Sequence, residues 1–413
     1  MRLRIPENEV SRVQFILALD IAEKLQRAGF ESLVVGGAVR DALLEIPSPD
    51  VDLCTACPSE ELEKLIPNAR PWGFCKYSVY RVPSEHGTIE IARFREEASC
   101  DGRHCEVRLT DSFERDVRRR DFTINALAVR PITLEVVDLV GGVADLSART
   151  IRAIGEPIRR YEEDKLRILR AVRFATRLDF KLSSDDAVAI EKLANGVKTL
   201  SAERVRGEIG GILECSHSGN GLELLIKLGI WCAIFGEEFD GDDIELARRV
   251  ALLNSAAVHG ISRAGMWAIF LAPIELKNKD LRIEVDKKLE RLKFPKAERE
   301  KISRILDGIR LALDFDNLTK ALSTALADSP ELSTVRKLTA LVAPDVRLET
   351  RLARRFPNLG APRFLRGSAL GEIVKDIPAE KVATILSELR YAELSGEVHT
   401  LDDAEHFITS RSL

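Results

Sequence analysis

The sequence lacks several features that would place the chain in a membrane or outside the cell. Its 413 residues contain no run of about 18 apolar residues, and the first ten residues form no apolar signal segment. The seven cysteines are sparse and odd in number, which favours reduced thiols over a disulfide framework. Aromatic residues make up only 6% of the chain, too few for rows of base-stacking rings. These absences predict a cytoplasmic protein without a membrane partner.

Charge is nearly balanced over the whole chain but uneven along it. The 62 Lys and Arg face 66 Asp and Glu, a formal net charge of −4. The stretch from Arg115 to Lys181 nevertheless has 15 basic and 10 acidic residues, and the stretch from Glu275 to Arg310 has 12 and 8. Two basic zones on an acidic chain indicate an extended polyanion partner such as RNA, although two solvated helix faces would give the same counts.

Hydrophobic periodicity divides the chain near residue 150. Before that point we expect a leading helix, a short second helix and four strands, hence one α/β or α+β domain. From Ile158 onward helical periodicity dominates, which predicts several helical sub-bundles. The expected helices cover Asn8–Ala28 and Val39–Leu44, and the expected strands cover Leu33–Val35, Val51–Leu53, Thr88–Phe94 and Leu134–Leu139.

A glycine pair and two carboxylates accompany the first two expected strands. Gly36 and Gly37 lie between a strand and a helix, where backbone amides can approach phosphates closely. Asp50 and Asp52 alternate along an extended chain, so both carboxylates lie on one face and can share hard cations such as Mg²⁺. An Asp-x-Asp alone is usually a surface turn, but its position after the glycine pair favours a metal site. Two Mg²⁺ ions would activate an attacking hydroxyl and stabilise leaving phosphate oxygens.

Glu90 is the candidate third carboxylate. Alternation in the expected strand sends Ile89 and Ile91 to one side and Glu90 to the other. Glu90 would then complete the carboxylate cluster, or it would simply face solvent on a half-exposed strand. The sequence leaves both alternatives open.

A basic run, Arg118–Arg120, precedes Asp121 and Asn125. Guanidinium groups suit triphosphate oxygens, and Asp121 or Asn125 can hold a ribose hydroxyl. Such a run is more often a solvated surface. The apolar residues interleaved after it favour partial burial and therefore a binding role.

Residues Glu163–Phe174 are predicted to form one amphipathic helix. Asp164 and Arg167 would then project side by side, three residues apart. This pair is either an ordinary intrahelical ion pair or a reader of a base edge. Arg170 and Arg173 continue the basic face of the same helix.

Taken in order, these motifs resemble the class II tRNA nucleotidyltransferase and bacterial poly(A) polymerase family. The resemblance spans roughly residues 34 to 209 and rests on the stretches VVGGAVRDALLEIPSPDVDLCT, RRRDFTINALAV, VDLVGGVADLSARTIRAIGEP, EEDKLRILRAVRFATRLDF and SAERVRGEI. It implies an α+β fold with an N-terminal nucleotidyltransferase palm of the polymerase β type, containing a mixed sheet, followed by all-helical neck, body and tail domains. The implied boundaries are palm 1–150, neck 151–215, body 216–275 and RNA-binding tail 276–413.

The resemblance also implies a reaction and the residues that perform it. The reaction is template-independent addition of C, C and A to tRNA 3′ ends from CTP and ATP, with pyrophosphate released and no DNA involved. Asp164 and Arg167 would replace a nucleic-acid template, and Glu203-Arg204 would brace the base-reading helix. The implied catalytic residues are Asp50, Asp52 and Glu90, with two Mg²⁺ ions on Asp50 and Asp52, and the implied nucleotide-binding residues are Gly36, Gly37, Arg40, Arg120, Asp121, Asn125, Asp164, Arg167, Arg170 and Arg173.

Other functions stay open at this point. An A-adding enzyme or a poly(A) polymerase would keep the same motifs, and a non-catalytic RNA-binding protein would keep the fold but lose the metal carboxylates. The segment from Arg95 to Val117 resembles the family's full-length flexible loop, which CC-adding relatives lack. Lys165 departs from the family pattern, in which Pro is common at this position. The sequence leaves the oligomeric state open.

Overall fold

A computed structural model describes residues 1–48, 50–72, 79–100, 105–239, 241–272, 281–360, 363–365 and 379–412. The contacts divide the chain into two compact units. The first comprises Met1–Ile209 and Leu224–Glu237, and the second comprises Gly210–Glu223 and Glu238–Leu413. The predicted division into four domains stays a prediction.

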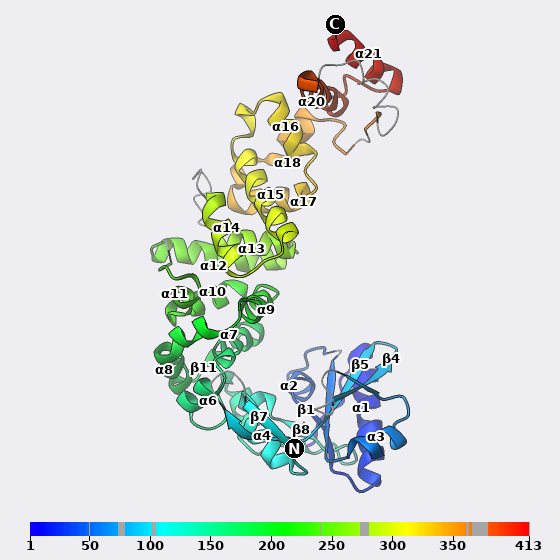
Figure 1. Ribbon diagram of the computed structural model, residues 1–413, viewed down its shortest axis with the longest axis vertical. Helices are drawn as coiled ribbons and strands as arrows, with labels where there is room; N and C mark the ends of the chain where they lie inside the picture. Colours follow the sequence, from blue (N-terminus) through cyan, green and yellow to red (C-terminus); the bar gives the residue numbers. More distant parts are fainter. Residues whose placement is uncertain are drawn as a thin grey trace. The chain divides into compact units, whose positions relative to one another are not determined.

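A seven-stranded sheet organises the N-terminal part of the first unit (Figure 1). Its strand order is β3-β4-β5-β2-β1-β8-β9. All neighbours pair antiparallel except β2 and β5, which pair parallel, so the predicted mixed sheet is confirmed. The strands of the sheet are β1 (Ser32–Val35), β2 (Val51–Thr55), β3 (Arg70–Pro71), β4 (Val79–Ser84), β5 (Gly87–Arg93), β8 (Ala128–Val129) and β9 (Val136–Val137).

One face of the sheet packs on the leading helix α1 (Glu9–Arg27). The Asn8 side chain caps this helix by accepting a hydrogen bond from the Ser11 amide, and Gly29 at φ 95° follows its end. The predicted helix is present, and buried apolar side chains such as Phe15 and Leu25 recur at helical spacing along it. The short helix α3 (Ser59–Leu65) also contacts α1.

The other face is covered only in part. A second core gathers side chains from β1 and β2 with residues of the helix α4 (Phe113–Arg119) and of the segment before β8. Its buried members are Leu33, Val35, Cys54, Phe94, Phe113, Val117, Ala126, Ala128 and Ile154. Beyond this cover, polar side chains of β2, β5 and β4 remain accessible on the same face.

The segment that resembles a flexible family loop contains regular structure. It holds a two-stranded hairpin, β6 (Arg95–Cys100) and β7 (Cys105–Leu109), followed by α4. The expected strand Leu134–Leu139 is reduced to β9, and Leu134 adopts a positive φ of 57° just before it. A further two-stranded sheet pairs β10 (Thr150–Ile151), at the start of the helical region, in parallel with β11 (Lys181–Leu182), which lies within that region.

Helices follow almost without interruption, as the periodicity predicts. In the order of the chain these are α2 (Gly37–Leu43) within the sheet region, then α5 (Gly142–Ser147), α6 (Pro157–Glu163), α7 (Leu166–Leu178), α8 (Ser184–Leu193), α9 (Ala202–Leu213), α10 (Ser218–Lys227) and α11 (Ile230–Phe235). The short 3₁₀ turns η2 (Thr123–Asn125) and η3 (Ala194–Thr199) belong to the same unit. No helix among the described residues combines the length and the apolar character needed to cross a bilayer.

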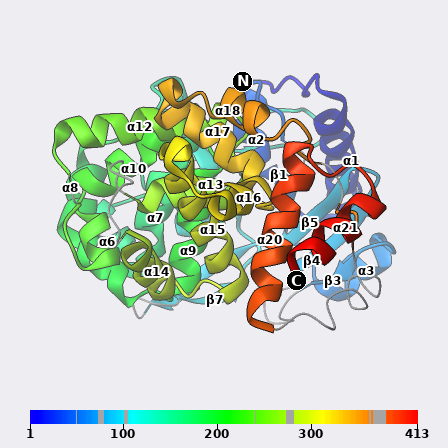
Figure 2. The ribbon, with the colours of Figure 1, turned by 90° about the horizontal axis from the view of Figure 1, so that it is seen from above.

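The second unit is all helical in the part that the structure describes. Besides the parts of α9 and α10 that fall within Gly210–Glu223, its helices are α12 (Asp243–Val258), α13 (Arg263–Leu271), α14 (Leu281–Arg291), α15 (Lys296–Leu313), α16 (Lys320–Ala327), α17 (Leu332–Val342), α18 (Leu348–Arg355), α20 (Ala379–Ser395) and α21 (Leu401–Ser412). Helices α13, α15 and α17 pack together, and α20 lies beside α21 over its own apolar cluster (Figure 2).

Candidate active site

A cleft of about 460 Å³ brings most of the predicted site residues together. This volume lies in the range of small-molecule sites. Its lining comprises Gly36, Gly37, Arg40, Asp52, Arg119, Arg120, Asp121, Asn125, Asp164, Arg167, Arg170, Phe174 and Arg177. Asp50, Glu90 and Arg173, which the sequence also nominates, lie outside this lining. Arg119, Phe174 and Arg177 are additions that the sequence reasoning did not assign.

The carboxylates meet at the accessible end of strand β2. Asp52 pairs in register with Glu90 on the parallel strand β5, so the two side chains are neighbours on one face. Limited solvation and then the charge of Glu90 raise the pKa of Asp52 to about 6, while Arg120 acts in the opposite direction. Asp50 adds a further negative charge to the same neighbourhood. Crowding of negative charge at one point is the arrangement that a bound cation relieves.

These residues fit Mg²⁺ by donor type. Among the described residues no group of three or more His, Cys, Asp and Glu side chains is gathered as a metal cage. Mg²⁺ is commonly held by one or two carboxylates together with water and substrate phosphates, and Asp50 and Asp52 match this donor type. Glu90 forms an ion pair with Arg81 on β4, and its membership of the metal site stays a prediction.

Gly36 and Gly37 form the turn between β1 and α2. Gly36 has φ 77° and ψ −136°, a backbone region that side-chain-bearing residues rarely adopt. Its amide donates to the Leu127 carbonyl, which fixes the turn against the segment before β8. A Cβ atom at Gly36 would lie 3.5 Å from Arg120 Nη1, so the backbone and the guanidinium are in close approach.

Arg120 is held rigidly by three groups. Its Nε donates to Asp116 Oδ2 at 3.0 Å, its Nη1 donates to the Asn125 carbonyl at 3.3 Å, and its Nη2 donates to Cys54 Sγ at 3.2 Å. Asp116 is fully buried and also pairs with Arg119. Burial alone would raise the pKa of Asp116, but Arg120 and Arg119 outweigh burial and hold it below its ordinary value. An ionised Asp116 therefore fixes two guanidinium groups of the cleft.

A chain of hydrogen bonds connects α2 with α7. The buried Arg40 donates through Nε to Asp41 Oδ1 at 2.7 Å and through Nη1 to Asn125 Oδ1 at 2.6 Å. Asn125 Nδ2 donates to Asp121 Oδ1 at 3.2 Å, and Arg170 Nε donates to Asp121 Oδ2 at 2.9 Å. Burial would raise the pKa of Asp121, but the charge and hydrogen bonds of Arg170, with further donors, keep it below its ordinary value. The predicted residues of this chain are thus in mutual contact.

The prediction of one continuous helix over Glu163–Phe174 is wrong. Helix α6 ends at Glu163, and α7 starts at Leu166. Between them Asp164 is extended, with φ −144° and ψ 106°, and its Oδ1 accepts from the Leu166 amide at 3.0 Å. Asp164 and Arg167 therefore do not project from one helix at three-residue spacing. Asp164 instead lies in the joint, the two-residue connection Asp164–Lys165 between α6 and α7.

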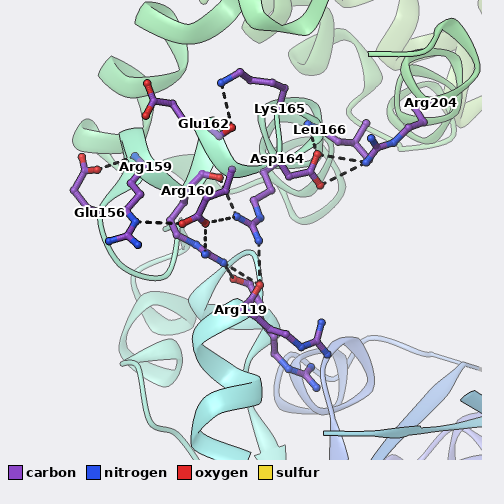
Figure 3. A network of polar contacts seen from close by, with 12 residues as sticks. Arg119, Glu156, Arg159, Arg160, Glu162, Asp164, Lys165, Leu166 and Arg204 are labelled. Atoms are coloured by element: carbon purple, nitrogen blue, oxygen red, sulfur yellow. Dashed lines mark hydrogen bonds and ion pairs between the residues drawn. The ribbon is translucent and has the colours of Figure 1, made fainter. Parts of the chain in front are cut away.

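Separate partners hold the two members of the proposed base reader, and Figure 3 shows the contact of Asp164 with Arg204. Arg204 Nη2 on α9 lies 3.4 Å from Asp164 Oδ1, the contact expected of a bracing residue. The buried Arg167 donates through Nη1 to Glu163 Oε2 at 3.0 Å and to the Arg160 carbonyl at 2.9 Å. Its Nη2 donates to the Arg119 carbonyl at 3.1 Å. The segment between α6 and α7 is thereby held both by α9 and by the last residue of α4.

The remaining arginines of α7 are paired as well. Arg173 Nε lies 2.8 Å from Glu208 Oε2 on α9, and Arg177 Nη2 lies 3.1 Å from Asp41 Oδ2. The Phe174 ring lies within cation–π distance of Arg40, Arg170 and Arg173. Arg177 could have been found from its place on the helical stripe that already contains Arg170 and Arg173.

Comparisons with known proteins identify the family of the chain. Residues 32–152 match the model of the Poly A polymerase head domain, and residues 179–240 match that of the probable RNA and SrmB-binding site of polymerase A. The CCA-adding enzyme of Latilactobacillus sakei is 38% identical over 220 residues, which are 53% of this chain and 55% of that protein. The CCA-adding enzyme of Enterococcus faecalis is 32% identical over 307 residues, which are 73% of this chain and 72% of that protein.

A solved structure extends the likeness to nearly the whole chain. The Bacillus stearothermophilus CCA-adding enzyme in complex with CTP has a TM-score of 0.74 at 27% identity and covers 96% of this chain and 97% of its own. Some sequence alignments are shorter, and the chain spans about half the length of the Latilactobacillus relative. The fold and the cleft define a nucleotidyltransferase palm continued by helices. The chain belongs to the class II CCA-adding enzyme family, whose head domain is that of the poly(A) polymerases.

Proposed function

We propose that this protein adds C, C and A to the 3′ end of tRNA, using CTP and ATP and no nucleic-acid template. The observation that carries the proposal is the composition of one cleft. Asp52, the phosphate-binding candidate Arg120 and the proposed base readers Asp164 and Arg167 all line it. A nucleoside triphosphate is recognised by its triphosphate, its ribose and its base. The lining contains a candidate group for each of them: Arg120 for the triphosphate, Asp121 or Asn125 for the ribose, and Asp164 with Arg167 for the base.

The acidic and basic groups divide the chemical work. Asp50 and Asp52 would hold two Mg²⁺ ions, which lower the pKa of an attacking 3′-hydroxyl and neutralise charge on the leaving pyrophosphate. Arg120 is oriented by the buried Asp116, so its guanidinium is presented to phosphate oxygens without further ordering. The turn at Gly36 brings backbone close to the same place. The fixed guanidinium groups match the negative charge of a triphosphate.

Base selection follows from donor and acceptor positions. Cytosine and adenine each present an amine donor beside a ring nitrogen acceptor, which match Asp164 as acceptor and Arg167 as donor. Uracil and guanine present the reverse pattern, and each buried mismatch costs about 1–3 kcal/mol. The carboxylate of Asp164 has acceptor positions beyond the two contacts with Arg204, so the brace and a base can be accommodated together.

Two other activities use the same cleft. An A-adding enzyme would accept only a CC-ended tRNA, and a poly(A) polymerase would extend general RNA ends. A non-catalytic RNA-binding protein is disfavoured because Asp50 and Asp52 are both present. The Latilactobacillus sakei and Enterococcus faecalis relatives are CCA-adding enzymes, which favours CCA addition.

The test is nucleotide incorporation by the purified protein with Mg²⁺. Transcripts of one tRNA ending before CCA, after CC and after CCA are each incubated with CTP, ATP or both. Addition of C, C and A followed by a stop is the expected result. Addition of A to the CC-ended transcript only would indicate an A-adding enzyme, and long A tails would indicate a poly(A) polymerase. No incorporation on any transcript would contradict the proposal.

A further inference from the structure

A row of side chains crosses the accessible face of the sheet and begins at Asp52 in the cleft lining. Arg81 on β4, Glu90 on β5 and Asp52 on β2 occupy successive register positions, so their side chains lie on the same face. Arg81 and Glu90 form an ion pair. The guanidinium of Arg81 lies 3.8 Å from the centre of the Trp72 ring, just beyond the end of β3. The row therefore runs from Asp52 through Glu90 and Arg81 to Trp72.

The order of the strands assigns this row to one side of the reaction. Apart from Asp52 on β2, the cleft lining comes from the turn after β1 and helix α2, from the end of α4 and the segment before β8, and from α7 and the residues before it. Strands β1 and β8 lie on one side of β2, whereas β5, β4 and β3 lie on the other. Attacking and leaving oxygens stand roughly in line across the phosphorus in phosphoryl and nucleotidyl transfer. If the triphosphate fills the cleft, the acceptor strand must approach Asp52 from the side of β5, β4 and β3.

Trp72 is unusual among the tryptophans of the chain. Of the three, Trp231 and Trp267 are 3% and 1% exposed, whereas Trp72 is 54% exposed. Trp72 is therefore the tryptophan whose ring a ligand can reach. Arg81 covers part of the ring and is itself tied to Glu90, so the ring is oriented while much of its surface is open. Single-stranded RNA is commonly bound by stacking a base on such a ring.

We propose that Trp72, oriented by Arg81, stacks an unpaired base at the 3′ end of the acceptor RNA. Three strand spacings, about 14 Å, separate β2 from β3, so the ring serves a base within the last few nucleotides of the strand. Arg70 pairs in register with Arg81 and supplies an exposed cation for the RNA backbone on the same face. This inference rests on the proposed function, because it takes the acceptor to be RNA and the cleft to hold the triphosphate.

Trp72 fluorescence provides a direct measurement, because the other two tryptophans are buried. The full-length protein is titrated with a tRNA transcript ending after CC and with one trimmed back to the last base pair of the acceptor stem. Stacking predicts quenching by the CC-ended transcript, weaker quenching by the trimmed one, and loss of the difference in Trp72→Phe. Equal quenching by both transcripts would overturn the proposal, as would a difference that persists in Trp72→Phe.

Steady-state kinetics give an independent test. Trp72→Ala is expected to raise KM for the CC-ended tRNA about tenfold, the loss of one base stack, with KM for ATP within about twofold of wild type. Trp72→Phe keeps an aromatic face and should restore most of the affinity, whereas Trp72→Leu should not. Ile132→Ala is the matched control, since Ile132 is 55% exposed and lies away from the row.

Two results separate the possible failures. If Trp72→Ala incorporates nucleotides at the wild-type rate and with an unchanged KM for tRNA, the proposed function stands. The Trp72–Arg81 contact would then only cover the edge of the sheet, and the stacking proposal would be wrong. A wild-type protein that incorporates no nucleotide, yet shows quenching that depends on the 3′ end, would contradict the proposed function and keep the RNA-binding platform.

Discussion

Arg204 on α9 contacts the carboxylate of Asp164, which lies between α6 and α7. Its Nη2 lies 3.4 Å from Oδ1 and 3.5 Å from Oδ2, across 40 residues of sequence. Asp164 is extended and belongs to neither α6 nor α7, so this contact helps determine where its oxygen atoms point. The orientation of the proposed base reader therefore depends on α9 as well as on α7.

Removal of this brace should relax nucleotide choice. In Arg204→Ala we expect the ratio of UTP to CTP incorporation to rise about tenfold, because a loosened Asp164 penalises the wrong base less. The ratio is measured with both nucleotides on the same tRNA transcript. A general loss of folding would lower both rates together and leave the ratio unchanged. Lys192→Ala, which removes an exposed cation of α8, is the matched control.

Asp52 should be indispensable for incorporation. Asp52→Asn keeps the shape of the side chain but removes a negative charge that a bound cation needs. The rate of nucleotide incorporation should therefore fall by a factor on the order of 10²–10³. Binding of tRNA, measured by filter retention or anisotropy, should stay within about threefold. Asp20→Asn on the exposed side of α1 controls for loss of charge in the same unit. Activity near wild type in Asp52→Asn would remove this residue from the metal site.

Asp121 should make the free energy of unfolding depend on pH in the acidic range. Its pKa in the folded protein is below the ordinary value because Arg170 and the hydrogen bonds outweigh burial. Its ionised form thus contributes stability above about pH 4, and this contribution is lost as the pH falls through the folded pKa. Asp121→Asn should lower the free energy of unfolding by about 1–3 kcal/mol at neutral pH. In urea unfolding, the gap between wild type and variant should narrow as the pH falls below about 4; a gap independent of pH would refute the assignment.

Two adjacent glycines should differ in their tolerance of a methyl group. Gly36→Ala forces a side chain onto a positive φ of 77° and should cost about 1–3 kcal/mol of stability. Gly37 is the first residue of α2, and its φ lies outside the positive range, so Gly37→Ala should cost less. Thermal unfolding of the two variants measures the difference. Equal losses would mean that backbone conformation does not explain the glycine at position 36.

Local patterns predicted much of the palm. Helix α1 and strands β1, β2 and β5 are confirmed because each has a clear apolar period and a nearby turn residue. The alternation at Glu90 is confirmed too, since Ile89 and Ile91 are buried and Glu90 is accessible. Position along the strand placed Glu90 opposite Ile89 and Ile91, but the pairing of β5 with β2, which brings Glu90 beside Asp52, comes from the structure.

Other features depend on contacts that no local pattern contains. The break between α6 and α7 falls in a stretch without Gly or Pro, and the residues that hold it, Arg204 and Arg119, are distant in sequence. Asp116 was missed for the same reason. Its importance arises because the fold brings the Arg95 amide and both guanidinium groups to one buried carboxylate.

Helix α7 is fastened to the sheet region along its length. Arg167 bonds the Arg119 carbonyl at its start, Arg170 bonds Asp121, and Arg177 bonds Asp41 near its end. A hinge between the helix and the sheet would break all of these contacts at once, several of them buried. The proposed addition of C, C and A at one catalytic centre would require the growing 3′ end to reposition each time. The fastening of α7 favours translocation of the RNA past a fixed nucleotide site over opening of that site.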